Sequence, residues 1–148
     1  MYVVVMGYGR VGYHLVRALL AIGYEVLVIE KDVARCESIQ EELGSIALHG
    51  NGSELDILKK AGLARADIFI AAGGDEDNLA SCQMAKYVFG AARTMALVED
   101  PEQDALFRLL GVDVVVNGTN LVLSAIEEEL PGRPILHLMS LKSGQQEM

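Results

Sequence analysis

Tryptophan is absent from this chain of 148 residues, and aromatic residues make up only 5% of it. Cysteine is also scarce, with Cys36 and Cys82 far apart and no CxxC pair. This usage favours a reducing compartment and gives no sign of a zinc site. No apolar run reaches the ~18 residues that a membrane-spanning helix requires. The apolar start at residues 1–6 is too short for a signal peptide and lacks a basic flank, so we expect no direct membrane insertion.

Basic residues are the minority charge, with 12 Lys and Arg against 21 Asp and Glu and a formal net charge of −9. This balance argues against binding nucleic acid or anionic lipid through a generic basic surface. Hydrophobic residues reach 51% and there are 15 glycines, which fits a tightly turned α/β domain. The length predicts one domain, with a core that buries roughly 70% of the unfolded surface.

Short apolar runs alternate with amphipathic segments along residues 2–130. The apolar runs predict strands buried on both faces, at residues 2–6, 26–29, 46–48, 67–71, 94–98 and 112–116. The segments between them predict helices at residues 11–22, 33–43, 53–61, 77–89, 101–110 and 120–130. This alternation predicts a Rossmann-type doubly wound parallel sheet of about six strands, with right-handed crossovers and helices on both faces.

Short polar residues predict where these helices start, and apolar residues at helical spacing predict which face of a helix is buried. The candidate N-caps are Asp32, Ser53 (in a capping box), Asp77 or Asp75, and Asp100. The stripe of the first helix consists of Val11, Leu15, Leu19 and Ile22.

A glycine-rich turn follows the first expected strand, and its sequence is Gly7-Tyr8-Gly9-Arg10-Val11-Gly12. In this G-x-G-x-x-G pattern Gly7 permits the tight turn, Gly9 lets a diphosphate approach the backbone, and Gly12 lets the helix pack closely on the sheet. The amides at the helix start attract phosphate oxygens. Arg10 either reaches a bound phosphate or lies on the surface. The alternative is that the glycines serve only as turn residues.

Glu30 stands at the end of the second expected strand, 18 residues beyond Gly12. This is near the ~20 residues at which an acid in this fold accepts bonds from ribose hydroxyls. A carboxylate repels a 2′-phosphate, so Glu30 favours NAD or a plain adenosine nucleotide over NADP. Lys31 beside it softens that exclusion. The residues therefore predict an adenine nucleotide as the ligand and leave open whether it is NAD(H) or ATP/ADP.

Four further segments appear in the order of a known family, at residues 48–53 (LHGNGS), 66–72 (ADIFIAA), 75–78 (DEDN) and 109–115 (LLGVDVV). With the glycine turn and Glu30, they make residues 1–130 resemble the TrkA-N family, also called KTN or RCK. These are regulatory domains of potassium transporters and channels. The resemblance implies a cytoplasmic domain, peripheral to the inner membrane, that binds an adenine nucleotide and controls a K⁺ transporter or channel subunit.

The resemblance also implies further nucleotide-binding positions. Near the adenine and ribose it places Gly50, Asn51 and Gly52, with Ser53 of the same loop among the binding residues. The cleft at the end of the fourth strand would be lined by Ala72 and Gly73. Two more candidates, Asn78 and Glu99, open the next helix and close the fifth strand; each is alternatively a plain structural residue. Asp77 opens the same helix, facing the cleft.

This chain departs from the family pattern in two places. Residues 117–119 read NGT where some members carry a metal-binding glutamate, so we expect no metal site there. Asn51 replaces the commoner Asp and removes a charge near the nucleotide. We interpret residues 1–132 as the nucleotide-binding lobe and residues 133–148 as a tail or the start of a missing second lobe.

The last expected helix carries apolar residues at helical spacing, namely Leu121, Val122, Ile126 and Leu130. This stripe either packs on its own sheet or forms a contact between copies, and the resemblance implies a homodimer or higher ring.

Residues for catalysis are not apparent. His14, His49 and His137 share no metal-ligand spacing, and no G-x-S-x-G turn occurs. We therefore expect a binding domain rather than an enzyme, with a fragment of an NAD-dependent oxidoreductase as the alternative.

Overall fold

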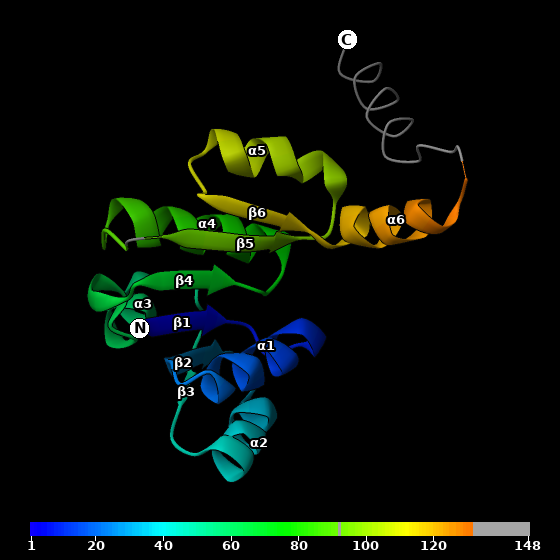
Figure 1. Ribbon diagram of the computed structural model, residues 1–148. Coiled ribbons are helices and arrows are strands. Elements are labelled where there is room, and N and C mark those ends of the chain that lie inside the picture. Colours follow the sequence, from blue (N-terminus) through cyan, green and yellow to red (C-terminus); the bar gives the residue numbers. More distant parts are fainter. Residues whose placement is uncertain (92, 132–148) are drawn as a thin grey trace.

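A computed structural model of the chain describes residues 1–91 and 93–131, so the predicted tail at 133–148 lies outside the described residues. Six parallel strands form one sheet in the order β3-β2-β1-β4-β5-β6, which confirms the predicted doubly wound fold (Figure 1). The strands are β1 (Tyr2–Met6), β2 (Glu25–Glu30), β3 (Ala47–His49), β4 (Ile68–Ala71), β5 (Thr94–Val98) and β6 (Val114–Asn117). The helices are α1 (Arg10–Ala21), α2 (Val33–Leu43), α3 (Leu55–Lys60), α4 (Asp75–Tyr87), α5 (Asp104–Leu109) and α6 (Gly118–Glu129), with 3-10 turns η1 (Leu63–Arg65) and η2 (Pro101–Gln103).

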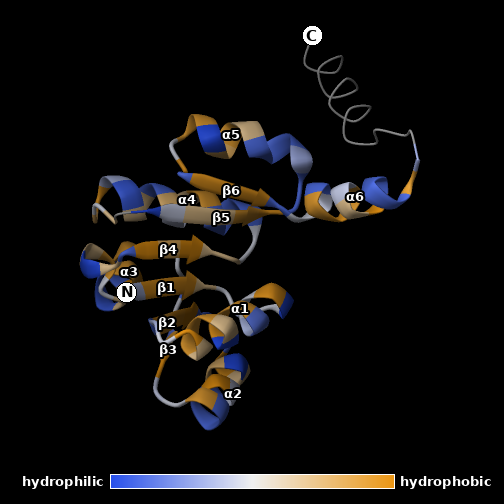
Figure 2. Cartoon of the chain, viewed as in Figure 1, coloured by the Kyte–Doolittle hydropathy of each residue, from blue (hydrophilic) through white to orange (hydrophobic). Residues whose placement is uncertain are grey.

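The central strand β1 supplies both hydrophobic cores because its successive side chains point to opposite faces. Val3 and Val5 pack into one core with Val16 of α1 and Ile39 of α2. The alternate residues, such as Val4, join a second core formed largely by α3, α4 and α5, with Leu58, Cys82 and Phe107. All five β1 residues are buried, as the continuous apolar run predicted. Figure 2 shows the strands as the most apolar part of the chain.

Several predicted helix starts differ from the structure. Ser53 does not cap α3: its amide and hydroxyl both donate to Asn51 Oδ1, while Glu54 is the N-cap residue without a side-chain bond. The N-cap of α4 is Gly74, and the predicted caps Asp75 and Asp77 lie inside the first turn of the helix. Asp32 and Asp100 do cap as predicted, accepting bonds from the amides of Ala34 and Glu102.

The predicted stripe of α1 is partly wrong. Val11 and Ile22 are exposed, whereas Gly12 and Val16 form the most buried line of the helix. Gly12 lies against the Gly7 carbonyl oxygen of the preceding turn, and Leu15 and Leu19 of the predicted stripe are partly buried against the core. The predicted helix at 101–110 is divided, because η2 precedes the shorter α5.

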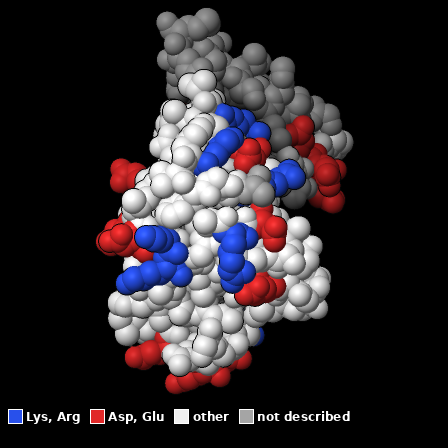
Figure 3. Space-filling view, turned by 90° about the vertical axis from the view of Figure 1, so that its left-hand side faces the viewer, with Lys and Arg blue, Asp and Glu red and all other residues white. Residues whose placement is uncertain are grey.

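Lysine and arginine side chains gather on the face at the amino ends of the strands, with acidic side chains between them (Figure 3). At this edge Arg65 pairs with Glu25 at 3.0 Å and Lys86 with Asp113 at 3.1 Å. Within residues 1–91 and 93–131, none of the helices has the length and apolar character needed to cross a bilayer. In the same ranges, His, Cys, Asp and Glu side chains form no group of three that could hold a metal ion.

The contrast between Gly12 and Gly9 gives a stability prediction. A Cβ added at Gly12 would lie well inside van der Waals contact with the Gly7 carbonyl oxygen, whereas a Cβ at Gly9 would meet nothing within 4 Å. We expect Gly12→Ala to lower the free energy of unfolding by about 2 kcal/mol, because backbone must move to relieve the overlap. Gly9→Ala is the matched control and should change it by less than about 0.5 kcal/mol. Urea denaturation measures both, and equal stability of the two variants would contradict the packing role of Gly12.

Candidate functional site

A cavity of about 450 Å³ opens at the carboxyl edge of the sheet, beside the ends of the paired strands β1 and β4, whose following helices pack on opposite faces. Ligands of doubly wound sheets bind at such switch points, and the volume is typical of small-molecule sites. The cavity is lined by Met6, Gly7, Tyr8, Gly9, Ile29, Glu30, Lys31, Asp32, Arg35, Gly50, Asn51, Gly52, Ala72, Gly73, Gly74, Asp77 and Glu99. Loops from five of the strands thus meet around one space.

The glycine-rich turn forms one wall of the cavity. Gly7 has φ 97°, and a Cβ there would come within 2.7 Å of the Ala72 carbonyl oxygen on the facing β4 loop. Gly9 is the N-cap of α1 and provides no side-chain cap. The backbone at this point is therefore open to the cavity, and the first amides of a 12-residue helix are available to an anion.

Glu30 is buried, with 4% of its surface exposed, and its carboxylate joins two loops. Its Oε1 accepts a bond from the Tyr8 amide at 3.1 Å, and its Oε2 accepts one from the Asp32 amide at 3.1 Å. Arg35 Nη1 approaches Oε1 to 3.7 Å. Each carboxylate oxygen has two acceptor positions, so Glu30 can hold these loops and still accept hydroxyl groups from the cavity.

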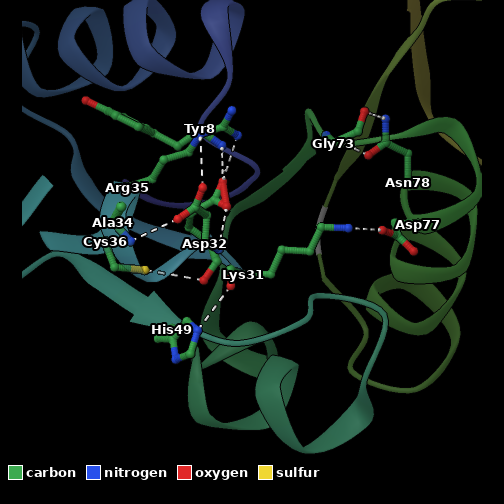
Figure 4. Close-up of polar contacts among 11 residues, drawn as sticks. Tyr8, Lys31, Asp32, Ala34, Arg35, Cys36, His49, Gly73, Asp77 and Asn78 are labelled. Carbon is green, nitrogen blue, oxygen red and sulfur yellow. Dashed lines mark hydrogen bonds and ion pairs between the residues drawn. The ribbon is translucent and has the colours of Figure 1, made fainter. Parts of the chain in front are cut away.

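The residues around Glu30 hold it from outside the cavity. Cys36 Sγ donates to the Glu30 carbonyl oxygen at 3.3 Å, and His49 Nε2 lies 3.1 Å from the Lys31 carbonyl oxygen. Burial, together with the carboxylates of Glu30 and Asp32, raises the pKa of the Cys36 thiol, so the thiol stays protonated at neutral pH. Tyr8 contributes its backbone to the site, because its ring points away from Gly73 and Asp77 (Figure 4).

Met6 forms an apolar floor that explains two glycines of the site. A Cβ on Gly52 would overlap the Met6 side chain, and one on Gly73 would lie 3.4 Å from Met6 Cε. Asn51 lies beside this floor, with its Oδ1 engaged by Ser53 at 2.9 Å and 2.7 Å. The small loop residues therefore bring backbone close to an apolar surface, which suits a flat aromatic base.

Asn78 lies behind the cavity wall rather than in it. The side chain is fully buried; its Oδ1 accepts from the Gly73 amide at 2.8 Å, and its Nδ2 donates to the carbonyl oxygens of Gly73 (3.0 Å) and Leu97 (2.8 Å). These bonds shape the β4–α4 loop and fasten it to β5. The geometry favours the structural alternative for Asn78, which then acts on a ligand only through the position of Gly73.

Most residues predicted for the site do line the cavity: Gly7, Tyr8, Gly9, Glu30, Lys31, Asn51, Gly52, Ala72, Gly73 and Glu99. The other predicted residues, Arg10, Val11, Gly12, Ser53 and Asn78, are not part of its lining. Arg10 and Val11 are exposed on the first turn of α1, whereas Gly12 is buried.

Sequence reasoning missed Asp32 and Arg35 as lining residues. It placed Asp77 at a helix start facing the cleft but did not name it as a binding residue. Asp32 and Arg35 belong to the beginning of α2, directly after Glu30, so their position in the chain was the available signal. Asp77 is joined to Lys31 by an ion pair of 3.3 Å that crosses from one side of the cavity to the other (Figure 4).

The hydrogen bonds of Asn78 predict its importance for stability. We expect Asn78→Ala to lower the free energy of unfolding by about 3 kcal/mol, because buried backbone groups lose their partners. Asn78→Asp should also be destabilising, since a carboxylate cannot donate to the Gly73 and Leu97 carbonyls. Urea denaturation measures these effects, with Asn51→Ala as the control for a half-buried amide. Wild-type midpoints for both Asn78 variants would show that the loop does not depend on this side chain.

Most of the chain is similar in sequence to a known protein family. The family model described as the TrkA-N domain matches residues 3–118. The chain is 32% identical over 149 residues to a "Trk system potassium uptake protein TrkA homolog" of Methanothermobacter thermautotrophicus, covering 100% of this chain and 68% of that protein. It is 33% identical over 116 residues to "Trk system potassium uptake protein TrkA" of Streptomyces coelicolor, covering 78% of this chain and 52% of that one. The chain thus spans only part of these relatives.

Solved structures show the same fold. The TrkA-N domain of the inner membrane protein ybaL from Escherichia coli superposes with a TM-score of 0.81 at 25% identity, covering 87% of this chain and 96% of that one. The GsuK channel bound to NAD has a TM-score of 0.71 at 23% identity, covering 78% of this chain and 21% of that one. The structure of GsuK bound to ADP also has a TM-score of 0.71, at 22% identity, covering 78% of this chain and 31% of that one. The family match over most of the chain and the shared fold confirm the resemblance, and the chain belongs to the TrkA-N domain family.

Proposed function

We propose that this chain is a regulatory domain that binds an adenine nucleotide, NAD(H) or ATP/ADP, and controls a potassium transporter or channel by changing conformation. The observation that carries the proposal is the pairing of the open start of α1 with the buried carboxylate of Glu30 across one cavity. The first attracts phosphate oxygens and the second accepts ribose hydroxyls.

The cavity offers a place for each part of such a ligand. The diphosphate would lie against the backbone of Gly7 and Gly9, and the ribose would bond to Glu30. The adenine would lie near the loop of Asn51 and Gly52, over the apolar Met6. This arrangement assigns binding roles to the cavity-lining residues. Gly12, Ser53 and Asn78 do not line the cavity and would instead hold the lining loops in position.

The relatives support both the ligand class and the process. GsuK has been solved with NAD and with ADP, and the curated relatives are named for potassium uptake. A membrane protein that conducts or transports K⁺ is therefore the proposed partner, and it would hold this domain at the cytoplasmic side of the membrane.

Nucleotide binding would act by adding contacts across the cavity, whose mouth is spanned by the weak Lys31–Asp77 pair. The cavity lining combines loops after β1, β2 and β3 with loops after β4 and β5, so a ligand would tie the two halves of the sheet together. Glu99 connects the cavity to α6, because Thr119 Oγ1 at the start of α6 donates to the Glu99 carbonyl oxygen at 2.9 Å. A coupling of about 1–3 kcal/mol between ligand and partner is ordinary for such switching.

α6 is the proposed contact between copies of the chain. None of its residues is buried, and it continues beyond the carboxyl ends of the strands (Figure 1). Leu121, Val122 and Ile126 are exposed along it, at 60%, 60% and 46%, and apolar positions recur along the helix in Figure 2. Such a face suits a homodimer or higher ring, because association would remove this apolar area from water.

The ligand assignment predicts that Glu30→Gln weakens binding of NAD and ADP by about 1–3 kcal/mol, because a charge-assisted bond to the ribose is lost. Isothermal titration calorimetry measures the dissociation constants. Glu37→Gln, an exposed position on α2 outside the cavity, is the charge-matched control and should bind as the wild type does. Unchanged affinity in Glu30→Gln would contradict the assignment of the ribose to Glu30.

The dimer assignment predicts that Ile126→Glu shifts the chain toward the monomer, because a charge in the centre of the apolar face would be desolvated on association. Analytical ultracentrifugation measures the shift, with Glu128→Gln on the same helix as the control. A wild type that is monomeric at high concentration would contradict the assignment.

The oxidoreductase alternative requires turnover. Incubation with NADH and a range of carbonyl compounds, followed at the absorbance of the reduced nicotinamide, separates the two functions. Steady loss of absorbance would favour the enzyme, whereas binding without turnover supports the regulatory function.

A further inference from the structure

An ion pair spans the mouth of the cavity. Lys31 follows β2 on one side, and Asp77 lies in the first turn of α4 on the other. Lys31 Nζ and Asp77 Oδ2 are 3.3 Å apart, and the extended Lys31 side chain crosses the gap between them (Figure 4). The two side chains are 69% and 34% exposed, so the pair is weak and is accessible to a ligand entering the cavity.

The charges of the cavity lining are unusual for a phosphate site. Four carboxylates line it, those of Glu30, Asp32, Asp77 and Glu99, against the two cations Lys31 and Arg35. Both cations are already paired, Lys31 with Asp77 and Arg35 with Glu30 and Asp32. The lining therefore has a formal net charge of −2 and no unpaired cation.

These charges bear differently on ligands that carry different numbers of phosphates. The amides at the start of α1 can stabilise a diphosphate. A third phosphate brings additional negative charge toward Asp77 and Glu99, and Lys31 can approach it only by leaving Asp77. Asp77 itself is favoured where it stands, because a carboxylate in the first turn of a helix interacts well with the helix dipole.

We propose that Asp77 is a specificity-determining residue of this site. By holding Lys31 across the cavity mouth it disfavours nucleoside triphosphates relative to ligands that carry two phosphates, such as NAD(H) and ADP. This inference rests on the proposed function, since it requires a nucleotide in the cavity, and it selects between ligands that the glycine turn and Glu30 accept equally.

The test compares the dissociation constants of ATP and NAD for the wild type and for charge-matched variants by calorimetry. Asp77→Asn frees Lys31 without changing side-chain size, and we expect it to tighten ATP binding about three- to fivefold while changing NAD binding less than about twofold. Glu76→Gln removes an equal charge from the same turn, but Glu76 is exposed and does not line this cavity. It should leave the ratio of the two constants near the wild-type value, and Asp77→Glu should as well.

A double variant separates release of Lys31 from a general change in charge. In a Lys31→Gln background, Asp77→Asn should shift the ratio no more than Glu76→Gln does, because no lysine remains to be released. Equal shifts in the Asp77→Asn and Glu76→Gln single variants, or a full shift without Lys31, would overturn the proposal. If the wild type binds neither nucleotide, the proposed function itself fails, which is a distinct outcome.

Discussion

The site depends on one buried carboxylate. Glu30 accepts the amides of Tyr8 and Asp32, and so fixes the glycine-rich turn relative to the start of α2. A carboxylate with 4% exposure is tolerated because backbone donors and Arg35 offset the loss of water. Glu30 also lines the cavity, so the residue that organises the loops is also the one offered to a ligand.

The remainder of the site follows from close backbone approach. Gly7 lies against Ala72 after β4, in the other half of the sheet, and Gly52 after β3 lies against Met6 of β1. Glycine at these positions therefore lets the loops meet at one space. Asn78 fixes the far side by saturating its amide with the backbone of Gly73 and Leu97. Backbone contacts and hydrogen bonds therefore frame a cavity whose mouth is crossed by a weak ion pair, an arrangement suited to a ligand-dependent change.

The sequence was informative wherever a local pattern had one physical solution. Continuous apolar runs predicted the buried strands, and β1 and β5 have the predicted bounds. Helix starts were harder to predict from the sequence. Ser53 has the spacing of a capping box, but its amide and hydroxyl donate to Asn51 Oδ1 instead of capping α3. The most buried line of α1 could not be predicted from its apolar stripe, because that line includes Gly12, which has no side chain and lies against the Gly7 carbonyl oxygen. The Lys31–Asp77 pair joins residues 46 positions apart, and only the folded sheet brings them together.

A crystal structure of the chain with NAD, and a second with ADP, tests the nucleotide site most directly. We expect the diphosphate oxygens within hydrogen-bonding distance of the backbone amides at the start of α1, with a ribose hydroxyl donating to the Glu30 carboxylate. A cavity that stays empty at millimolar nucleotide, or a nucleotide bound away from Glu30, would contradict nucleotide binding at this site and with it the proposed regulation.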